Sequence, residues 1–417
     1  NRRARAMSNQ RTAPIPIDQA RSQLLASIDM ISTTEIVSLD DACGRIAAEN
    51  ITSLIDLPRT HNAAVDGYGV DSAELAAAPH KLFKIIGVAR AGHPFDGVIG
   101  AGEAIEIYTG AVMPSGPDCV AMHEDCSRTD DTVVITANLS KASNMRPPGE
   151  NLAKGETIIT KGQMITAALV GQLAAAGTAQ VEVARCLRVA VMSTGDEVVA
   201  AGTDAAHAQI FDANRPMLKA MLQSKQIEVI DCGIVPDRLD ALADAYEQAL
   251  QKADVVISSG GASDGIEDHS QQAMEQIGAN CAFWRLAMKP GRPMAVGQLG
   301  KQLVFCLPGN PVAAFVCTRL LINPVLTRLL GGIVQPTLKI SVPAGFTHRK
   351  KPGRAEFLRV VLVDEGDGQV LKLHGRKGAG VISSLTGADG LVEIPLENAG
   401  VDKGLTLSFL PFHERGL

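Results

Sequence analysis

This sequence has few aromatic residues and no large excess of one charge. Phe, Trp and Tyr make up only 3% of its 417 residues, so the cores must be built mainly from aliphatic side chains. The net charge of −6 argues against a nucleic-acid-binding surface. Apolar runs stop short of a membrane span, and no apolar leader-like run follows the basic start. We therefore expect a protein without nucleic-acid or membrane partners.

Paired cysteines are also missing. The eight cysteines are scattered, mostly in apolar runs, and no Cys-x-x-Cys pair occurs among them. This spacing resembles neither a zinc site nor a redox site. Buried free thiols in a reducing cytosol are the expected state.

The chain is long and rich in glycine and proline. Its 417 residues are too many for one ordinary hydrophobic core, and its 40 Gly and 21 Pro indicate many loops. We therefore expect several loop-rich domains. Strand-like runs broken by Gly, Pro and Asp mark the β regions. The predicted division is an elongated α+β N-terminal domain (13–57 plus 147–185), an inserted β domain (58–146), an α/β domain (186–332) and a C-terminal β domain (333–417).

A regular alternation of strand, loop and helix begins at Leu187. It predicts a central, doubly wound α/β domain, which binds ligands at the carboxyl ends of its parallel strands. The chain as a whole is thus expected to be a multidomain α/β protein. The predicted strands are 187–192, 228–232, 254–257 and 303–307, and the predicted helices are 214–224, 238–252, 270–278 and 312–323.

The most informative stretch is 258–269, which follows an apolar, β-branched strand. Its paired glycines, Gly260 and Gly261, let the backbone turn sharply and approach a ligand closely. Successive N–H groups in such a turn can bind a phosphate or another oxyanion. The next helix begins near Ser270, so Asp268 also fits as its N-cap, and capping is compatible with metal binding. Three carboxylates here suit a hard cation such as Mg²⁺: Asp264, Glu267 and Asp268.

Further motifs follow other predicted strands. The segment 193–197 is either a polar turn or a ligand site. In 289–293 and 307–311, rigid Pro-Gly loops hold backbone donors beside the positive charge of Lys289 and Arg292. Salt bridges and plain helix initiation are the alternatives there. Local sequence explains Asp237 as a helix cap, and it explains Asp66-Gly67 and Thr109-Gly110 as ordinary turns.

Taken in order, these motifs resemble one family, the molybdopterin molybdenumtransferases, whose relatives include the E domain of gephyrin. The resemblance runs from about Ile15 to the C-terminus, and a chance match to the whole ordered set is very unlikely. It is carried by 64–68, 108–110 with 113–114, Arg146 with 149–150, 193–197, 212–214, 259–263, 289–293, 307–311 and 353–357.

The resemblance implies an elongated, cytoplasmic homodimer with four domains per chain. It also implies Mg²⁺-dependent insertion of molybdate into adenylylated molybdopterin with release of AMP, alongside a molybdopterin adenylyltransferase and downstream molybdenum cofactor enzymes. By motif position, the implied catalytic residues are Asp66, Thr109, Glu197, Asp237 and Asp268, the last three as candidate Mg²⁺ ligands. The implied substrate-binding residues are Arg146, Ser193, Thr194, Gly195, Gly260, Gly261, Ser263, Lys289, Arg292, Pro308, Gly309, Asn310 and Pro311.

Three positions depart from the family pattern. Asn151 stands where Asp is usual, Asp264 replaces a small apolar residue, and Gly69 replaces an Ala. Two alternatives stay open. A molybdopterin adenylyltransferase has a fold similar to the α/β domain, although the extra segments here favour the insertase. A non-catalytic molybdopterin-binding scaffold is the second alternative.

Overall fold

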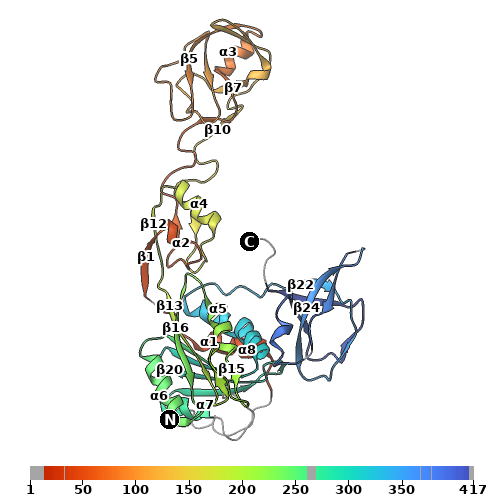
Figure 1. Ribbon diagram of the computed structural model, residues 1–417. Coiled ribbons are helices and arrows are strands. Elements are labelled where there is room, and N and C mark those ends of the chain that lie inside the picture. Colours follow the sequence, from red (N-terminus) through yellow and green to blue (C-terminus); the bar gives the residue numbers. More distant parts are fainter. Residues whose placement is uncertain (1–13, 32, 261–268, 367, 377, 413–417) are drawn as a thin grey trace.

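The computed structural model describes residues 14–31, 33–260, 269–366, 368–376 and 378–412 (Figure 1). The molecule is elongated (Figure 1). At one end lies a β body, made of the elements from β3 (Asn62–Ala63) to β10 (Met145–Arg146), which a narrow neck joins to the rest of the chain (Figure 1). The α/β sheet and the C-terminal β structure lie side by side at the other end (Figure 1).

The central element is a six-stranded sheet of order β16-β13-β17-β21-β20-β18. Its first four strands are parallel, which confirms the predicted α/β core: β16 (Ile227–Val235), β13 (Leu187–Thr194), β17 (Val255–Ser259) and β21 (Gln302–Leu307). Two antiparallel strands, which the sequence pattern did not predict, complete the sheet: β20 (Pro293–Leu299) and β18 (Asn280–Arg285). Pro293 and Gly297 lie within β20, and both residue types weaken a strand pattern.

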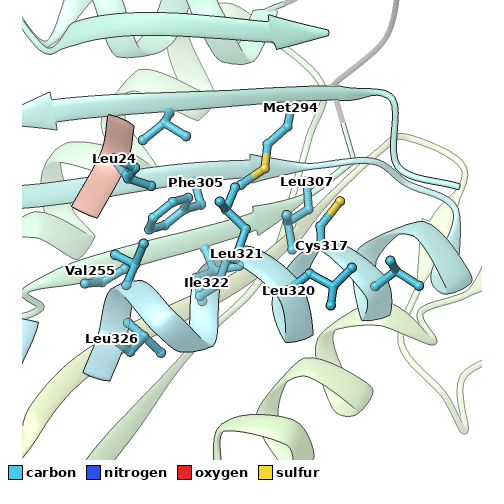
Figure 2. Packing of buried hydrophobic residues seen from close by; sticks show 14 of the residues in the cluster. Leu24, Val255, Met294, Phe305, Leu307, Cys317, Leu320, Leu321, Ile322 and Leu326 are labelled. Atoms are coloured by element: carbon cyan, nitrogen blue, oxygen red, sulfur yellow. The ribbon is translucent and has the colours of Figure 1, made fainter. Parts of the chain in front are cut away.

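Helices cover both faces of this sheet. One face carries α1 (Ile17–Ser27), α5 (Asn214–Leu222), α8 (Pro311–Cys317), η2 (Thr318–Ile322) and α9 (Asn323–Leu329). The other carries α6 (Leu239–Leu250) and α7 (His269–Gln276). Figure 2 shows the first face, where Leu321 and Ile322 point from the helix toward Val255, Phe305 and Leu307 of the strands. This core is almost wholly aliphatic, as the composition predicts.

One helical stretch needs a correction to the sequence analysis. In the part of the chain that the structure describes, Pro311–Leu329 is long and apolar enough to cross a membrane by length and composition. The expectation that every apolar run stops short of a span is therefore wrong on those two criteria. Within its apolar window, 67% is buried inside the protein, which is the pattern of a core helix.

Chain segments on either side of the inserted β body pair with one another. β1 (Thr34–Ser38) is antiparallel to β12 (Gln180–Ala184), and β2 (Ile51–Thr52) pairs with β11 (Thr157–Ile159). With α2 (Leu39–Ala42) and α4 (Ala167–Ala175), these strands enclose a small separate core. The first helix, α1, lies instead against the α/β sheet, because Ile17, Ala20 and Leu24 are buried in its main core.

The body beyond the neck is built on a six-stranded sheet of order β7-β4-β6-β5-β9-β8. Its strands are β4 (Gly67–Val70), β5 (Leu82–Ala89), β6 (Glu103–Ile107), β7 (Cys119–Met122), β8 (Cys126–Thr129) and β9 (Thr132–Ile135). α3 (Ser72–Ala77) and the short η1 (His123–Asp125) complete it. β3 (Asn62–Ala63) pairs with β10 (Met145–Arg146) where the chain enters and leaves.

The C-terminal sheet has the order β19-β24-β26-β28-β22, with β25 beside β24. Its strands are β22 (Ile340–Pro343), β24 (Ala355–Asp364), β25 (Gln369–Leu373), β26 (Gly390–Ile394) and β28 (Thr406–Pro411). The edge strand β19 (Met288–Lys289) comes from the α/β region and joins the two bodies. Short pairs complete the fold: β14 (Val198–Val199) with β15 (Ile210–Phe211), and β23 (His348–Arg349) with β27 (Gly400–Val401); η3 is Ile382–Ser384.

None of the eight cysteines, all of which lie among the described residues, forms a disulfide. Cys119, Cys306 and Cys317 are buried as expected, and burial raises the pKa of Cys119 and of Cys317 to about 12. Cys43 is exposed, so the expectation of buried thiols is wrong for that residue.

Candidate active site

The predicted motifs of the α/β region meet at one edge of the sheet, where β13, β16, β17 and β21 end. The Gly260 N–H donates to Leu307 O at 3.1 Å, and the Gly195 N–H donates to Val235 O at 3.4 Å. The loops after these strands are therefore in direct contact. Parallel sheets bind ligands at such an edge.

Backbone rather than side chain fills the middle of this sheet edge. Gly260 has a φ of 106°, and a Cβ there would lie 2.2 Å from Thr194 O. A Cβ on Gly309 would lie 3.7 Å from the Gly260 Cα, so the two glycines face each other at contact distance. Only glycine fits at position 260, because the backbone of Thr194 occupies the space that a Cβ would take.

A buried amide ties two of these loops together. Asn214 Nδ2 donates to Ser259 Oγ and to Gly309 O, each at 2.7 Å. Ser193 Oγ donates to Asp212 Oδ1 at 2.8 Å. Asp212 and Asn214 were not among the predicted site residues, although the 212–214 motif carried part of the resemblance.

Carboxylates gather at the β13 and β16 ends of the same edge. The Asp237 N–H donates to Asp196 Oδ1 at 3.1 Å, so Asp196, which was not predicted, is the direct partner of Asp237. The Oδ1 atom of Asp237 is buried and has no hydrogen-bond partner among the described residues. Glu197, next in the chain to Asp196, is exposed.

The chemistry of these carboxylate oxygens suits a magnesium ion whose coordination shell is completed by water and substrate. No group of three His, Cys, Asp or Glu side chains with metal-site geometry occurs within residues 14–31, 33–260, 269–366, 368–376 and 378–412. Mg²⁺ commonly takes one or two protein carboxylates and fills its shell with water and phosphate oxygens. Glu197 and the unpartnered Asp237 oxygen are carboxylate ligands of the kind that Mg²⁺ takes. The predicted Gly261, Ser263 and Asp268, and the departure Asp264, lie outside the described residues.

The predicted pair Asp66 and Thr109 is formed, but elsewhere. Asp66 Oδ1 accepts from the Thr109 N–H at 2.7 Å and from Thr109 Oγ1 at 2.8 Å. These two hydrogen bonds, the backbone one first, lower the pKa of the Asp66 carboxyl. The pair is exposed on the body beyond the neck, away from the sheet edge of the same chain (Figure 1). Arg146 is also exposed, on β10 at the base of that body, 4.0 Å from Glu150 Oε2.

Lys289 belongs to a second site, a basic pocket of about 360 Å³ lined by residues of β19, β23 and β24 and of the loops beside them. Ala379 lines this pocket, and its carbonyl accepts from the Val312 N–H at 3.1 Å, so the pocket adjoins the 307–311 loop. Arg292, predicted with Lys289, is half-buried, and its carbonyl accepts from the Leu286 N–H at 2.7 Å. The cationic residues lining the pocket are Lys289, Arg349, Lys350, Lys351, Arg354 and Arg359.

A buried carboxylate lies among these cations. Glu356 Oε1 is 2.8 Å from Lys289 Nζ, and its Oε2 is 2.8 Å from His348 Nε2. Burial alone would raise the pKa of the Glu356 carboxyl, but the hydrogen bonds from Lys289 and His348 outweigh it and lower the pKa. Arg359, also buried, donates from Nε to Ser384 Oγ at 3.0 Å. Of this pocket the sequence analysis assigned only Lys289 a role; the basic run at 349–351 was the available signal.

The remaining predicted residues belong to the 307–311 loop at the sheet edge. Pro308 is buried, Gly309 and Asn310 are exposed, and Pro311 is the first residue of α8. Helix initiation, one of the two predicted roles of this motif, is therefore confirmed.

The fold and the two sites together define a multidomain α/β protein in which glycine-containing loops at the sheet edge adjoin a cationic pocket. Three family profiles match in succession: "MoeA N-terminal region (domain I and II)" at 15–177, "Probable molybdopterin binding domain" at 190–328 and "MoeA C-terminal region (domain IV)" at 341–412.

Individual relatives cover nearly the whole chain. The molybdopterin molybdenumtransferase of Haemophilus influenzae is 34% identical over 96% of this chain and 99% of its own length. That of a Nostoc species is 32% identical over 91% and 89%. The crystal structure of the molybdopterin biosynthesis moeA protein from Pyrococcus horikoshii OT3 superposes with a TM-score of 0.83 at 26% identity, covering 96% of this chain and 100% of that one. The chain belongs to the MoeA family of molybdopterin molybdenumtransferases, as the sequence resemblance implied.

Proposed function

We propose that this chain inserts molybdate into adenylylated molybdopterin and releases AMP, with Mg²⁺ as its cofactor. The observation that carries the proposal is that the two candidate anion sites, the sheet edge and the basic pocket, adjoin each other in a member of this family. The reaction joins two anionic substrates, so it requires two such sites within reach of each other.

The basic pocket is the proposed molybdate site. Molybdate is a tetrahedral oxyanion, and it is bound by the same ammonium and guanidinium donors that bind phosphate. A volume of about 360 Å³ admits the anion together with part of a second ligand. Lys289, at the mouth of the pocket with its side chain 63% exposed, presents an ammonium to that ligand.

The sheet edge is the proposed site for the phosphoanhydride. Gly309 is exposed and has no Cβ to keep a phosphate oxygen away from its backbone, and Ser193 and Thr194 end the strand at the same edge. Glu197 and Asp237, with Asp268 as the third candidate, would hold Mg²⁺. When bound, Mg²⁺ neutralises charge on the bridging and non-bridging oxygens of the anhydride. No protein nucleophile is required, because an oxygen of water or molybdate attacks phosphorus and AMP leaves.

Asp66 and Thr109 require a second chain in this proposal. Within one chain they lie on the body beyond the neck, separated from the sheet edge (Figure 1). A homodimer in which that body reaches the partner's sheet edge would bring the pair to the substrate. The proposal also includes a cytoplasmic location, with a molybdopterin adenylyltransferase supplying the substrate and molybdenum cofactor enzymes receiving the product.

The test is AMP release by the purified protein given adenylylated molybdopterin and Mg²⁺, with and without molybdate. Molybdate-dependent AMP release, with molybdenum-loaded cofactor formed, is the expected result. Binding without AMP release would indicate a scaffold, and consumption of ATP with molybdopterin would indicate an adenylyltransferase. Either result would overturn the proposal.

A further inference from the structure

Three side chains from three strands form a hydrogen-bonded chain into the basic pocket. His348 on β23 contacts Glu356 on β24, and Glu356 contacts Lys289 on β19, with both heavy-atom distances 2.8 Å. Lys289 and Glu356 are register partners in parallel strands, so the sheet itself sets them side by side. All three line the basic pocket.

Burial separates the roles of the three groups. His348 is 7% exposed and Glu356 is 5% exposed, whereas the Lys289 side chain is 63% exposed. Of these three groups, Lys289 is therefore the one that an incoming anion can contact. A buried carboxylate is costly unless each of its oxygens has a partner, and His348 supplies the partner for Oε2.

The imidazole is arranged to serve this one contact. Its Nε2 faces a carboxylate oxygen, so Nε2 carries the proton and donates it. Its Nδ1 is buried and has no hydrogen-bond partner among the described residues. The imidazole of His348 therefore makes its hydrogen bond to Glu356, although the ring also lines a pocket rich in cations.

We propose that His348 is a positioning residue: through Glu356 it sets the Lys289 ammonium at the mouth of the basic pocket for oxyanion binding. With Oε2 occupied by His348, Glu356 offers Lys289 one oxygen, and the ammonium keeps two of its three N–H donors for the anion. Without His348, both carboxylate oxygens compete for the ammonium and draw it toward the pocket wall. This inference rests on the proposed function, in which the oxyanion is molybdate.

The test compares two nearly isosteric substitutions. His348→Met removes the donor, whereas His348→Gln keeps an N–H at the end of a side chain of similar length. We expect H348M to raise the Kd for molybdate, measured by calorimetry on the full chain, about 5-fold, and H348Q to restore most of the loss. In the AMP-release assay H348M should raise the KM for molybdate and leave kcat unchanged.

A double-variant cycle shows whether the effect passes through Lys289. In a Lys289→Met background, H348M should change molybdate binding no further, because the ammonium that it positions is gone. Lys339→Met is the matched control, since Lys339 pairs with Glu393 Oε2 at 2.6 Å on the same sheet and does not line the pocket. If H348M does not fold, His348→Ser, which is too short to reach Glu356, replaces it.

Equal molybdate affinity in H348M and the unsubstituted protein would overturn the inference alone. An equal loss in the presence and absence of Lys289 would do the same, since it would show a general effect on the fold. Failure of the unsubstituted protein to bind molybdate would instead overturn the pocket assignment on which both proposals depend.

Discussion

The two proposed anion sites are built in different ways. At the sheet edge, Gly260 packs closely against the Thr194 backbone and faces Gly309, and the neighbouring polar groups are tied by short hydrogen bonds such as those of Asn214. In the basic pocket, charge dominates, with six cations around one buried acid. We therefore expect the first site to be sensitive to an atom added at Gly260. The second tolerates changes of shape but is sensitive to charge and to salt.

The largest expected effect tests the steric half of this comparison. Gly260→Ala should lower the free energy of unfolding by about 3–5 kcal/mol, because the added Cβ meets Thr194 O and the φ of 106° strains an L-residue. Gly309→Ala is the matched control, since its Cβ would make only an ordinary contact at 3.7 Å. Urea unfolding of both variants measures the difference. Equal losses of unfolding free energy in the two variants would mean that the close contact between Gly260 and the Thr194 backbone does not limit which residue fits there.

A second variant separates the chemistry of the two sites. Asp237→Asn should lower kcat for AMP release about 100-fold, because it removes a charge from the proposed Mg²⁺ position. Molybdate affinity should stay unchanged, since Asp237 is at the sheet edge and does not line the basic pocket. Asp240→Asn, on the exposed start of α6, is the control and should retain kcat. Loss of molybdate binding in D237N would show that the two sites are one.

The sheet edge could be predicted from the sequence, and most of the basic pocket could not. Each sheet-edge motif directly follows an apolar strand, and parallel strands end at the same edge, so local pattern and topology suffice to gather Ser193, Gly260 and Pro308. The pocket depends on β19 joining β24, which pairs Lys289 with Glu356 across 67 residues of chain. No local pattern specifies that register.

Other misses have similar causes. Strand β20 was missed because Pro293 and Gly297 interrupt its pattern. Strand β18 is defined by its antiparallel pairing with β20, and the packing of α1 on the α/β sheet is likewise a contact between distant segments. Asp237 shows the converse. Its cap-like sequence suggested a purely structural role, yet in the structure its Oδ1 is buried without a partner among the described residues. Local sequence cannot show whether a carboxylate that fits as a cap has its oxygens satisfied.

The smallest expected effect concerns pH and the basic pocket. The hydrogen bonds from Lys289 and His348 lower the pKa of Glu356 against the effect of burial. A carboxyl whose pKa is lowered on folding contributes stability that is complete above its unfolded pKa, ordinarily 4.5, and is lost as the pH falls through the folded pKa. Glu356→Gln should therefore cost about 1.5 kcal/mol of unfolding free energy at neutral pH.

Below the folded pKa this cost should shrink, because Glu356 of the unsubstituted protein is then protonated as well. Thermal unfolding of both proteins between neutral pH and the acid limit measures the convergence. Glu393→Gln, which breaks the exposed Lys339 pair on the same sheet, should cost less at every pH, since solvent screens that pair. A cost of E356Q that stays constant with pH would show that the carboxylate charge does not hold this pocket together. The pocket would then depend on shape, as the sheet edge does.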